Sequence, residues 1–309
     1  MILVAGATGL VGGMITRSLL KQRRAVRLLV RQGSAYQSFV GMGAQAVTGD
    51  LKEPASLVPA CHGVDVVITT ASSGQRGGAD NPQTVDLEGN RNLIGAARNA
   101  GVKQFIYISA LTGSVDHPVP LPRAKAQTEV TLIESGLPYT ILAANGIMDV
   151  MFPLVIGDHV RAGQPVTLVA DGRRRHSFVA ARDIAAFAVA VVDHQEALNR
   201  RIAIGGPEPV SWRDILAAYE RALGRPVPVQ CIAPGELLPD VPPVPGLTEL
   251  LSGLLAALET FDSPVDMTQT ATTFGVTLTT LDEFVAGELR NGPSYRAPSP
   301  NDAHSANPA

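Results

Sequence analysis

The chain has 309 residues, of which 45% are hydrophobic and 17% are charged, enough to bury the core of one large domain or two modest ones. Its net charge of −3 excludes strong attraction to nucleic acid or to an anionic membrane, and no stretch approaches the roughly 20 apolar residues of a membrane span. Two separated cysteines and six unclustered histidines indicate no metal site. An apolar strand that begins at residue 2 leaves no room for a signal peptide, so we expect a cytoplasmic protein.

The first 145 residues alternate between apolar runs and helical patterns. The apolar runs, interpreted as buried strands, lie at 2–5, 26–30, 46–48, 64–69, 105–109 and 139–142. Helical patterns lie between them, at 10–22, 34–42, 54–61, 86–100 and 125–135. Continuous apolar strands that alternate with helices are typical of a parallel sheet covered on both faces. The sequence therefore predicts an α/β protein whose residues 1–145 form a Rossmann-type, doubly wound parallel sheet.

The pattern becomes less regular after residue 145. We expect strands at 166–169 and 202–204, and helices at 184–192, 212–223, 248–261 and 281–289. The proline-rich segment 226–245 is expected to be a loop, and the polar segment 291–309 a disordered tail. Residues 177–205 are expected to return to the nucleotide-binding domain, whereas 146–176 and 206–290 form a smaller C-terminal α/β substrate lobe.

Residues 2–12, Ile-Leu-Val-Ala-Gly-Ala-Thr-Gly-Leu-Val-Gly, join a buried strand to a glycine-rich turn and a helix. Gly6 permits the sharp turn, Gly9 lets backbone amides approach a phosphate, and Gly12 lets the helix pack closely on the sheet. The helix that begins near Leu10 directs its free N–H groups and the positive end of its dipole at the anion. This order predicts a dinucleotide site, with cofactor contacts from Gly6, Thr8, Gly9, Leu10, Val11 and Gly12.

Four segments resemble the NmrA-like group of atypical short-chain dehydrogenase/reductases. They are Gly-Ala-Thr-Gly-Leu-Val-Gly at 6–12, Gly-Asp-Leu at 49–51, Ser-Gly-Leu-Pro-Tyr-Thr-Ile-Leu at 135–142 and Ser-Phe-Val-Ala-Ala-Arg-Asp-Ile-Ala at 177–185. The resemblance extends over about residues 1–290 and is strongest before residue 185. It implies a Rossmann sheet with a small C-terminal lobe, and an active site between the two.

The residue that follows the second predicted strand bears on the choice of dinucleotide. An acidic residue there would accept hydrogen bonds from the ribose 2′-OH and favour NAD, but the sequence has Arg31. A guanidinium suits the 2′-phosphate of NADP through bidentate, charge-assisted bonds. The alternative is a solvated surface arginine that tolerates NAD. We therefore expect NADP(H) and keep NAD(H) as the second possibility.

Other cofactor contacts are expected where strands end. Asp50 follows the third strand, where members of the resembled family hold the adenine amino group, and Leu51 adjoins it. Alternatively, Asp50 caps the next helix. Ala71, Ser72 and Ser73 follow the fourth strand, and Asn145 follows the sixth. Because ligands of open α/β sheets bind at the carboxyl ends of the strands, we expect these four residues beside the nicotinamide ribose.

The wider superfamily uses a serine, a tyrosine and a lysine, and the resemblance implies catalytic roles for Ser109 and Lys125, with Lys125 also holding the cofactor ribose. Four residues before Lys125 stands Leu121, so the tyrosine that donates the proton is missing. An easily reduced acceptor such as a quinone does not need it. His176 or His117 is an alternative donor, because histidine titrates near neutral pH. Each residue also has a simpler interpretation. Lys125 could be a cation on a helix surface, and Ser109 a strand-end hydroxyl that bonds its own backbone. The two histidines could be loop residues without a role in catalysis.

Methionine and aromatic side chains after the sixth strand suit a planar aromatic substrate. The predicted substrate-pocket residues are Met148, Met151, Phe152 and Phe178. Ordinary core packing explains them equally well. The arginine run 173–175 suggests an anionic substrate, but a solvated turn is the simpler interpretation.

These features predict an NAD(P)H-dependent oxidoreductase that acts on a small quinone-like or aromatic ketone substrate. Arginine outnumbers lysine 21 to 4, as in GC-rich genomes, and the tyrosine is missing. Both favour the hypothesis of a tailoring step in aromatic secondary metabolism, including a flavin-free oxygenation. The alternative is a non-catalytic NmrA-like sensor or regulator that binds a dinucleotide. The sequence leaves a monomer and a homodimer equally open.

Overall fold

The computed structural model describes residues 1–74, 77–239, 241 and 246–292. The chain divides into two compact units, the first made of residues 1–144, 184–203 and 274–276. The second contains residues 145–183, 204–273 and those from 277 onwards, as far as they are described. The segment that returns to the first unit therefore begins at residue 184 rather than 177. Most of the predicted tail, from residue 293, lies outside the described residues.

Seven strands form the sheet of the first unit, in the order β3-β2-β1-β4-β5-β6-β8. The strands are β1 (Ile2–Ala5), β2 (Val26–Val30), β3 (Gln45–Thr48), β4 (Val66–Thr69), β5 (Gln104–Ala110), β6 (Tyr139–Ala144) and β8 (Arg200–Ile204). The pairings from β3 to β6 are parallel, with Ile2 of β1 aligned to Val26 on one side and Val66 on the other. The strand order reverses at β1, as in a Rossmann sheet, which confirms the predicted fold class.

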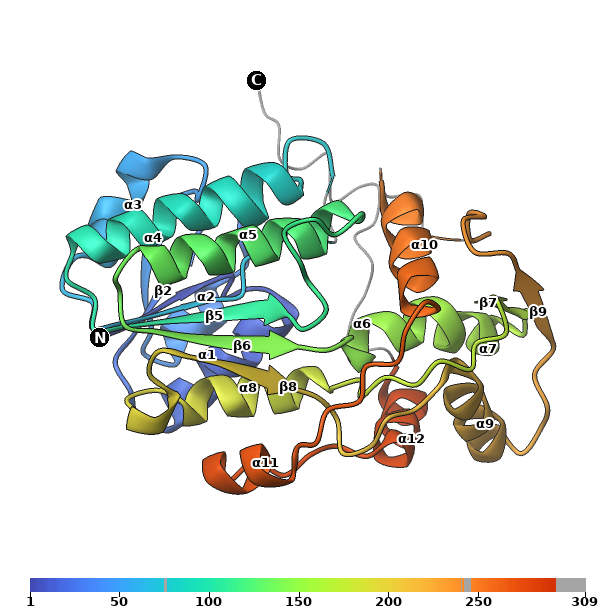
Figure 1. Cartoon of the computed structure of the whole chain (residues 1–309). Helices are drawn as coiled ribbons and strands as arrows, with labels where there is room; N and C mark the ends of the chain where they lie inside the picture. Colours follow the sequence, from blue (N-terminus) through green and yellow to red (C-terminus); the bar gives the residue numbers. More distant parts are fainter. Residues whose placement is uncertain (75–76, 240, 242–245, 293–309) are drawn as a thin grey trace. The chain divides into compact units, whose positions relative to one another are not determined.

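Helices cover both faces of this sheet. They are α1 (Leu10–Lys21), α2 (Gln37–Gly41), α3 (Pro54–Cys61), the π-helical segment η1 (Pro82–Gly89), α4 (Asn90–Asn99), α5 (Pro120–Glu134), α8 (Ala181–Ala190) and the short η3 (Gln195–Ala197). Figure 1 shows α3, α4 and α5 on one face and α1 and α8 on the other. Buried side chains of the helices and of the sheet form an apolar core, for example Leu57 of α3, Leu93 of α4 and Phe105 of β5. Burial on both faces explains why the strands have continuous apolar runs.

Two helices of this unit differ most from the prediction. The first four residues of the predicted helix 86–100 belong to the π-helical segment η1, which begins at Pro82 with a capping box of Asn81 and Thr84, and α4 begins at Asn90. Helix α5 begins at Pro120, five residues earlier than predicted, because proline at the first helical position needs no backbone hydrogen bond. The earlier start places Leu121 and Lys125 one turn apart on the same helix face.

The second unit contains a two-stranded parallel sheet of β7 (Val166–Val169) and β9 (Val229–Ile232). Its helical segments are α6 (Met148–Phe152), η2 (Pro153–Gly157), α7 (Asp158–Ala162), α9 (Trp212–Leu223), α10 (Leu247–Leu258), α11 (Thr268–Phe274) and α12 (Leu281–Asn291). Strand β9 lies within the predicted loop 226–245, and the helices from 148 to 162 and at α11 were not predicted. These elements are too short, or too uniformly apolar, to show a clear period.

Candidate active site

The turn between β1 and α1 has the geometry of a phosphate cradle. Gly6 has a φ of +81°, and a Cβ there would lie 2.6 Å from Thr70 Oγ1. A Cβ on Gly12 would lie 2.1 Å from the Gly6 carbonyl oxygen, so only glycine allows this approach. Helix α1 has Gly9 as its N-cap, with no capping side chain and no acidic residue in its described first turn. Its N-terminal N–H groups therefore suit the pyrophosphate of a dinucleotide.

The other predicted contacts of this turn differ in exposure. Thr8 and Gly9 are exposed, Leu10 is half-buried, and Val11 is buried. A ligand at the cradle would therefore meet Thr8 and the backbone around Gly9 directly. Val11 is 8% exposed, so its side chain offers such a ligand little surface.

Arg31 follows β2 and, among the described residues, forms a charged cluster with Asp80 and Lys52. Its Nη1 lies 2.5 Å from Asp80 Oδ2, and Lys52 Nζ lies 2.6 Å from Asp80 Oδ1. The sequence prediction did not include Lys52. The sequence did hold a signal for Lys52. This residue follows the strand that pairs in parallel with β2, and neighbouring parallel strands end at the same edge of a sheet, so Lys52 could have been predicted near Arg31.

Asp50 closes a turn before α3 and does not cap that helix. Its Oδ1 accepts a hydrogen bond from Lys52 N at 2.9 Å, whereas the N-cap of α3 is Glu53, without a side-chain cap. The alternative of a helix cap is therefore wrong. Leu51 is buried, and its carbonyl accepts a bond from Asn92 Nδ2. The contact of Asp50 with adenine stays a prediction.

The loop after β4 connects to a buried carboxylate. Ser73 is 5% exposed and donates to Asp86 Oδ2 through both its hydroxyl, at 2.6 Å, and its backbone N–H, at 2.9 Å. The predicted contacts Ala71 and Ser72 are half-buried in the same loop. Sequence reasoning placed Ser73 beside the nicotinamide ribose but missed Asp86, because the carboxylate comes from η1, a segment whose pattern carries no catalytic motif.

The structure brings Ser109 and Lys125 to the carboxyl end of β5. Ser109 is 4% exposed, and its Oγ has no hydrogen-bond partner within the described part of the chain. Lys125 Nζ donates to the Ile108 carbonyl at 3.2 Å and lies 3.8 Å from Asp86 Oδ1. It also lies 5.4 Å from the centre of the Tyr107 ring. Lys125 thus lies between the end of β5, which carries Ser109, and the Asp86 carboxylate that Ser73 holds.

Burial lowers the pKa of Lys125, while the carboxylates of Asp86 and Glu129 oppose this change. A lysine ammonium with a lowered pKa gives up a proton more readily. Burial raises the pKa of Tyr107, which is fully buried in the core and stays protonated. Tyr107 is therefore a poor proton donor.

Leu121 stands one turn before Lys125 in α5, at the position where the resemblance implies a tyrosine. It is half-buried, and its Cδ2 lies 3.2 Å from the place where a Cβ on Gly74 would be. Its side chain therefore lies against the loop that follows β4. His117, the other predicted donor of this unit, accepts a hydrogen bond from Val119 N through Nδ1, which is a local turn contact.

His176 and Asn145 lie in the second unit and contact the same residue. His176 is fully buried, and its Nδ1 lies 2.7 Å from Ser263 Oγ. Asn145 Nδ2 donates to the Ser263 carbonyl at 2.9 Å and to its hydroxyl at 3.0 Å. Burial lowers the pKa of His176. These contacts hold the segment around Ser263 in place, while the catalytic role of His176 and the cofactor role of Asn145 stay predictions.

The four predicted pocket residues belong to the core of the second unit, with exposed fractions of 0–9%. The Phe152 ring makes edge-to-face contacts with Phe178, at 5.2 Å between centroids, and with Phe284, at 5.3 Å. The packing of Met148, Met151, Phe152 and Phe178 favours the core interpretation. Their role in substrate binding stays a prediction.

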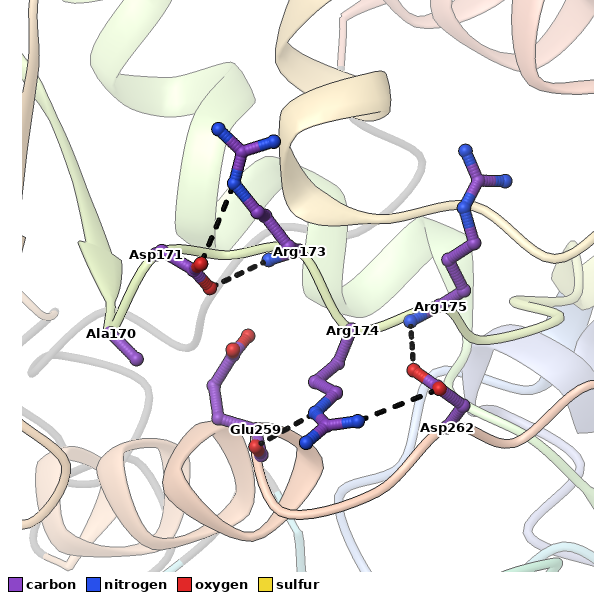
Figure 2. Close-up of a pocket in the computed structure, with 7 residues that line it drawn as sticks. All are labelled: Ala170, Asp171, Arg173, Arg174, Arg175, Glu259 and Asp262. Carbon is purple, nitrogen blue, oxygen red and sulfur yellow. Dashed lines mark hydrogen bonds and ion pairs between the residues drawn. The ribbon is translucent and has the colours of Figure 1, made fainter.

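The arginine run lines a hollow of about 380 Å³ in the second unit, shown in Figure 2. The hollow is also lined by acidic side chains. Arg173 Nε lies 3.4 Å from Asp171 Oδ2, and Arg174 Nη1 lies 3.6 Å from Asp262 Oδ2. Because carboxylates compensate these arginines, the hollow is not a simple anion site.

A search of the described residues finds no helix long and apolar enough to cross a membrane. Within the same residues, no group of three or more histidine, cysteine, aspartate or glutamate side chains is arranged to hold a metal ion.

The chain is similar to several reductases and to an assembly factor. It is 35% identical over 226 residues to the photosystem II assembly factor Ycf39 of Cyanophora paradoxa, covering 72% of this chain and 69% of the relative. It is 31% identical over 230 residues to an NAD(P)H azoreductase of Xenophilus azovorans, covering 74% and 75%.

Solved structures are similar over nearly the whole chain. The NADPH-dependent quinone oxidoreductase QOR2 of Escherichia coli, in complex with NADPH, matches with a TM-score of 0.77 and 25% identity, covering 94% of this chain and 100% of that one. The Citrobacter sp. triphenylmethane reductase with NADP(H) has the same fold, with a TM-score of 0.79, 22% identity and coverage of 93% and 99%. The model of the NmrA-like family matches residues 1–285. The chain therefore belongs to the NmrA-like family.

Proposed function

We propose that this protein is an NAD(P)H-dependent oxidoreductase that reduces a quinone-like or aromatic ketone substrate. The observation that carries the proposal is the position of Lys125 Nζ, which lies 3.8 Å from Asp86 Oδ1 and donates to the Ile108 carbonyl, next to Ser109 in β5. These residues lie in the same unit as the glycine cradle of β1 and α1. The names of the azoreductase and quinone oxidoreductase relatives support the same class of reaction.

The residues present fit a dinucleotide. The backbone around Gly9 and the N-terminus of α1 would hold the pyrophosphate, because the contacts at Gly6 and Gly12 leave no room for side chains. Arg31 and Lys52 would hold a 2′-phosphate, which favours NADP(H) over NAD(H). When bound, the nicotinamide supplies a hydride to the acceptor.

Ser109 and Lys125 act on the oxygen of the acceptor. The Ser109 hydroxyl, which has no partner within the described residues, donates a hydrogen bond to that oxygen as negative charge develops. Lys125 Nζ supplies a proton, because burial lowers its pKa, and the Asp86 carboxylate keeps the ammonium charged before transfer. A quinone delocalises the developing charge, so its reduction tolerates Leu121 in place of tyrosine.

Consumption of NADPH with a panel of acceptors tests this proposal. We expect loss of nicotinamide absorbance with benzoquinones and naphthoquinones, and slower loss with aromatic ketones. The variant Lys125→Met should reduce this consumption. Its matched control is Lys103→Met, which removes a lysine whose side chain is 77% exposed. Absence of turnover with every acceptor, despite cofactor binding, would contradict the proposal. Oxygen uptake in step with NADPH consumption would identify the flavin-free oxygenation that aromatic secondary metabolism suggests.

A second function, dinucleotide-dependent regulation without turnover, has its own support. Leu121 removes the usual proton donor, and one relative that is 35% identical is named an assembly factor. In that case, the protein would bind NADPH tightly, consume none of it, and form a stable complex with a protein partner. Pull-down with and without NADPH, together with the acceptor panel, distinguishes the two functions.

A further inference from the structure

Two cations from neighbouring strand ends meet at one carboxylate in the first unit. Arg31 follows β2, Lys52 follows β3, and these strands pair in parallel. Asp80 comes from the segment between β4 and η1 and uses one oxygen for each cation, at 2.5 Å and 2.6 Å. Its side chain is only 14% exposed, compared with 42% for Arg31 and 33% for Lys52. The carboxylate therefore occupies the centre of the cluster, where a bound anion would lie.

A ribose 2′-phosphate would need the same donors. A phosphate and a carboxylate both accept charge-assisted bonds from a guanidinium and an ammonium. Placing a phosphate dianion beside the Asp80 carboxylate would bring like charges within a few ångströms, which is unfavourable even where solvent screens them. The two anions therefore exclude each other at Arg31 and Lys52.

We propose that Asp80 occupies the 2′-phosphate position in the cofactor-free protein, that NADP(H) displaces it, and that it thereby limits the preference for NADP over NAD. The inference rests on the proposed function, because it concerns the same dinucleotide site. NAD carries a hydroxyl at this position, which does not compete with the carboxylate and can donate a hydrogen bond to it. Arg31 and Lys52 thus favour NADP, whereas Asp80 weakens the binding of NADP and leaves that of NAD unaffected.

The local structure allows this exchange. Asn81 and Thr84 form a capping box that holds the start of η1, and Thr84 Oγ1 donates to the Ala79 carbonyl at 2.7 Å. Hydrogen bonds of the backbone and of these side chains therefore fix the chain on both sides of Asp80. Rotation of the Asp80 side chain can release the two cations without unwinding η1.

Isothermal titration of the full chain with NADP, NAD and adenosine 2′,5′-bisphosphate tests the inference. We expect Asp80→Asn to bind NADP and the bisphosphate roughly three- to tenfold more tightly, because it removes the competing charge from a partly exposed cluster. NAD should bind no more tightly than to the unmodified protein. In the double variant with Arg31→Ala, the gain for NADP should shrink.

The control is Asp193→Asn, which breaks an exposed ion pair with Arg24 elsewhere in the first unit. It should change neither affinity. Unchanged or weaker binding of NADP by Asp80→Asn would overturn the inference, because Asp80 would then orient the cations rather than compete for them. An equal gain for NAD would overturn it as well. If the unmodified protein bound no dinucleotide at all, the proposed function itself would fail, which is a different result.

Discussion

The ammonium of Lys125 lies 3.8 Å from the carboxylate of Asp86, which is completely buried beneath the carboxyl end of β5. Ser73 donates two hydrogen bonds to the other oxygen of that carboxylate. A second buried acid, Glu129, comes from α5. Its Oε2 lies 2.7 Å from Arg201 Nε, and its charge adds to the negative potential around Lys125. The first unit thus encloses a charged network at the strand ends where its dinucleotide site is proposed.

Replacement of Lys125 should affect both catalysis and stability. In Lys125→Met, we expect kcat for quinone reduction to fall by roughly 100-fold or more, because the proton donor is lost. The free energy of unfolding should fall by about 3–5 kcal/mol, because Asp86 is left as a buried charge without its cation. Acceptor kinetics and urea unfolding measure the two effects. Unchanged kcat in a folded variant would show that Lys125 does not supply the proton.

Replacement of Asp86 should change the pH profile. The carboxylate raises the pKa of Lys125 against the effect of burial, so Asp86→Asn should lower that pKa further. The protonated form of Lys125 then disappears at a lower pH, and the alkaline limb of the kcat profile should move to lower pH. A limb that stays in place while kcat falls uniformly would indicate that Asp86 only supports the structure.

The glycine cradle and the strand order are predictable from the sequence because their signals are local. Gly6, Gly9 and Gly12 lie within residues 6–12, directly after an apolar strand, and helical patterns separate the apolar runs. Ser109 and Lys125 were selected for a different reason, because the resemblance implies their positions relative to the strands, and their catalytic roles stay predictions. The order of strand and helix patterns along the sequence is therefore enough to predict the main elements of the first unit.

The partners of these residues are not predictable in the same way. Arg31 contacts Asp80 from 49 positions away, and no local pattern selects Asp80 from the other acidic residues. In the second unit, Phe152 and Phe178 meet in the core because of tertiary packing, so their composition alone fits a core or a pocket equally. Contacts between residues far apart in the sequence determine both the partner of Arg31 and the surroundings of the two phenylalanines. A single sequence does not reveal such contacts.

Glu259 predicts a specific dependence of stability on pH. It follows α10 beside the hollow of Figure 2, where burial and the charges of Asp171 and Asp262 raise its pKa from 4.5 to about 7, against the opposing effect of Arg174. Because the folded chain holds this proton to a higher pH than the unfolded chain, stability is lost as the pH rises from about 4.5 through 7.

Glu259→Gln should therefore gain thermal stability over the unmodified protein progressively across this interval. Thermal unfolding at several pH values measures the difference in Tm. Glu249→Gln, an exposed position on the same helix, is the matched control and should show no such trend. A difference in Tm that is constant with pH would contradict a titrating Glu259.

Gly12→Ala tests the cradle itself. The new Cβ would lie 2.1 Å from the Gly6 carbonyl oxygen, so α1 must move away from the turn. We expect dinucleotide affinity to fall roughly tenfold or more, and overpacking to lower the free energy of unfolding by about 1–3 kcal/mol. Gly95→Ala is the matched control, because a Cβ at this position in α4 meets no atom within 4 Å. It should leave binding unchanged and add about 0.5–1 kcal/mol of stability. Equal affinity of Gly12→Ala and the unmodified protein in titration calorimetry would show that the dinucleotide binds away from this turn.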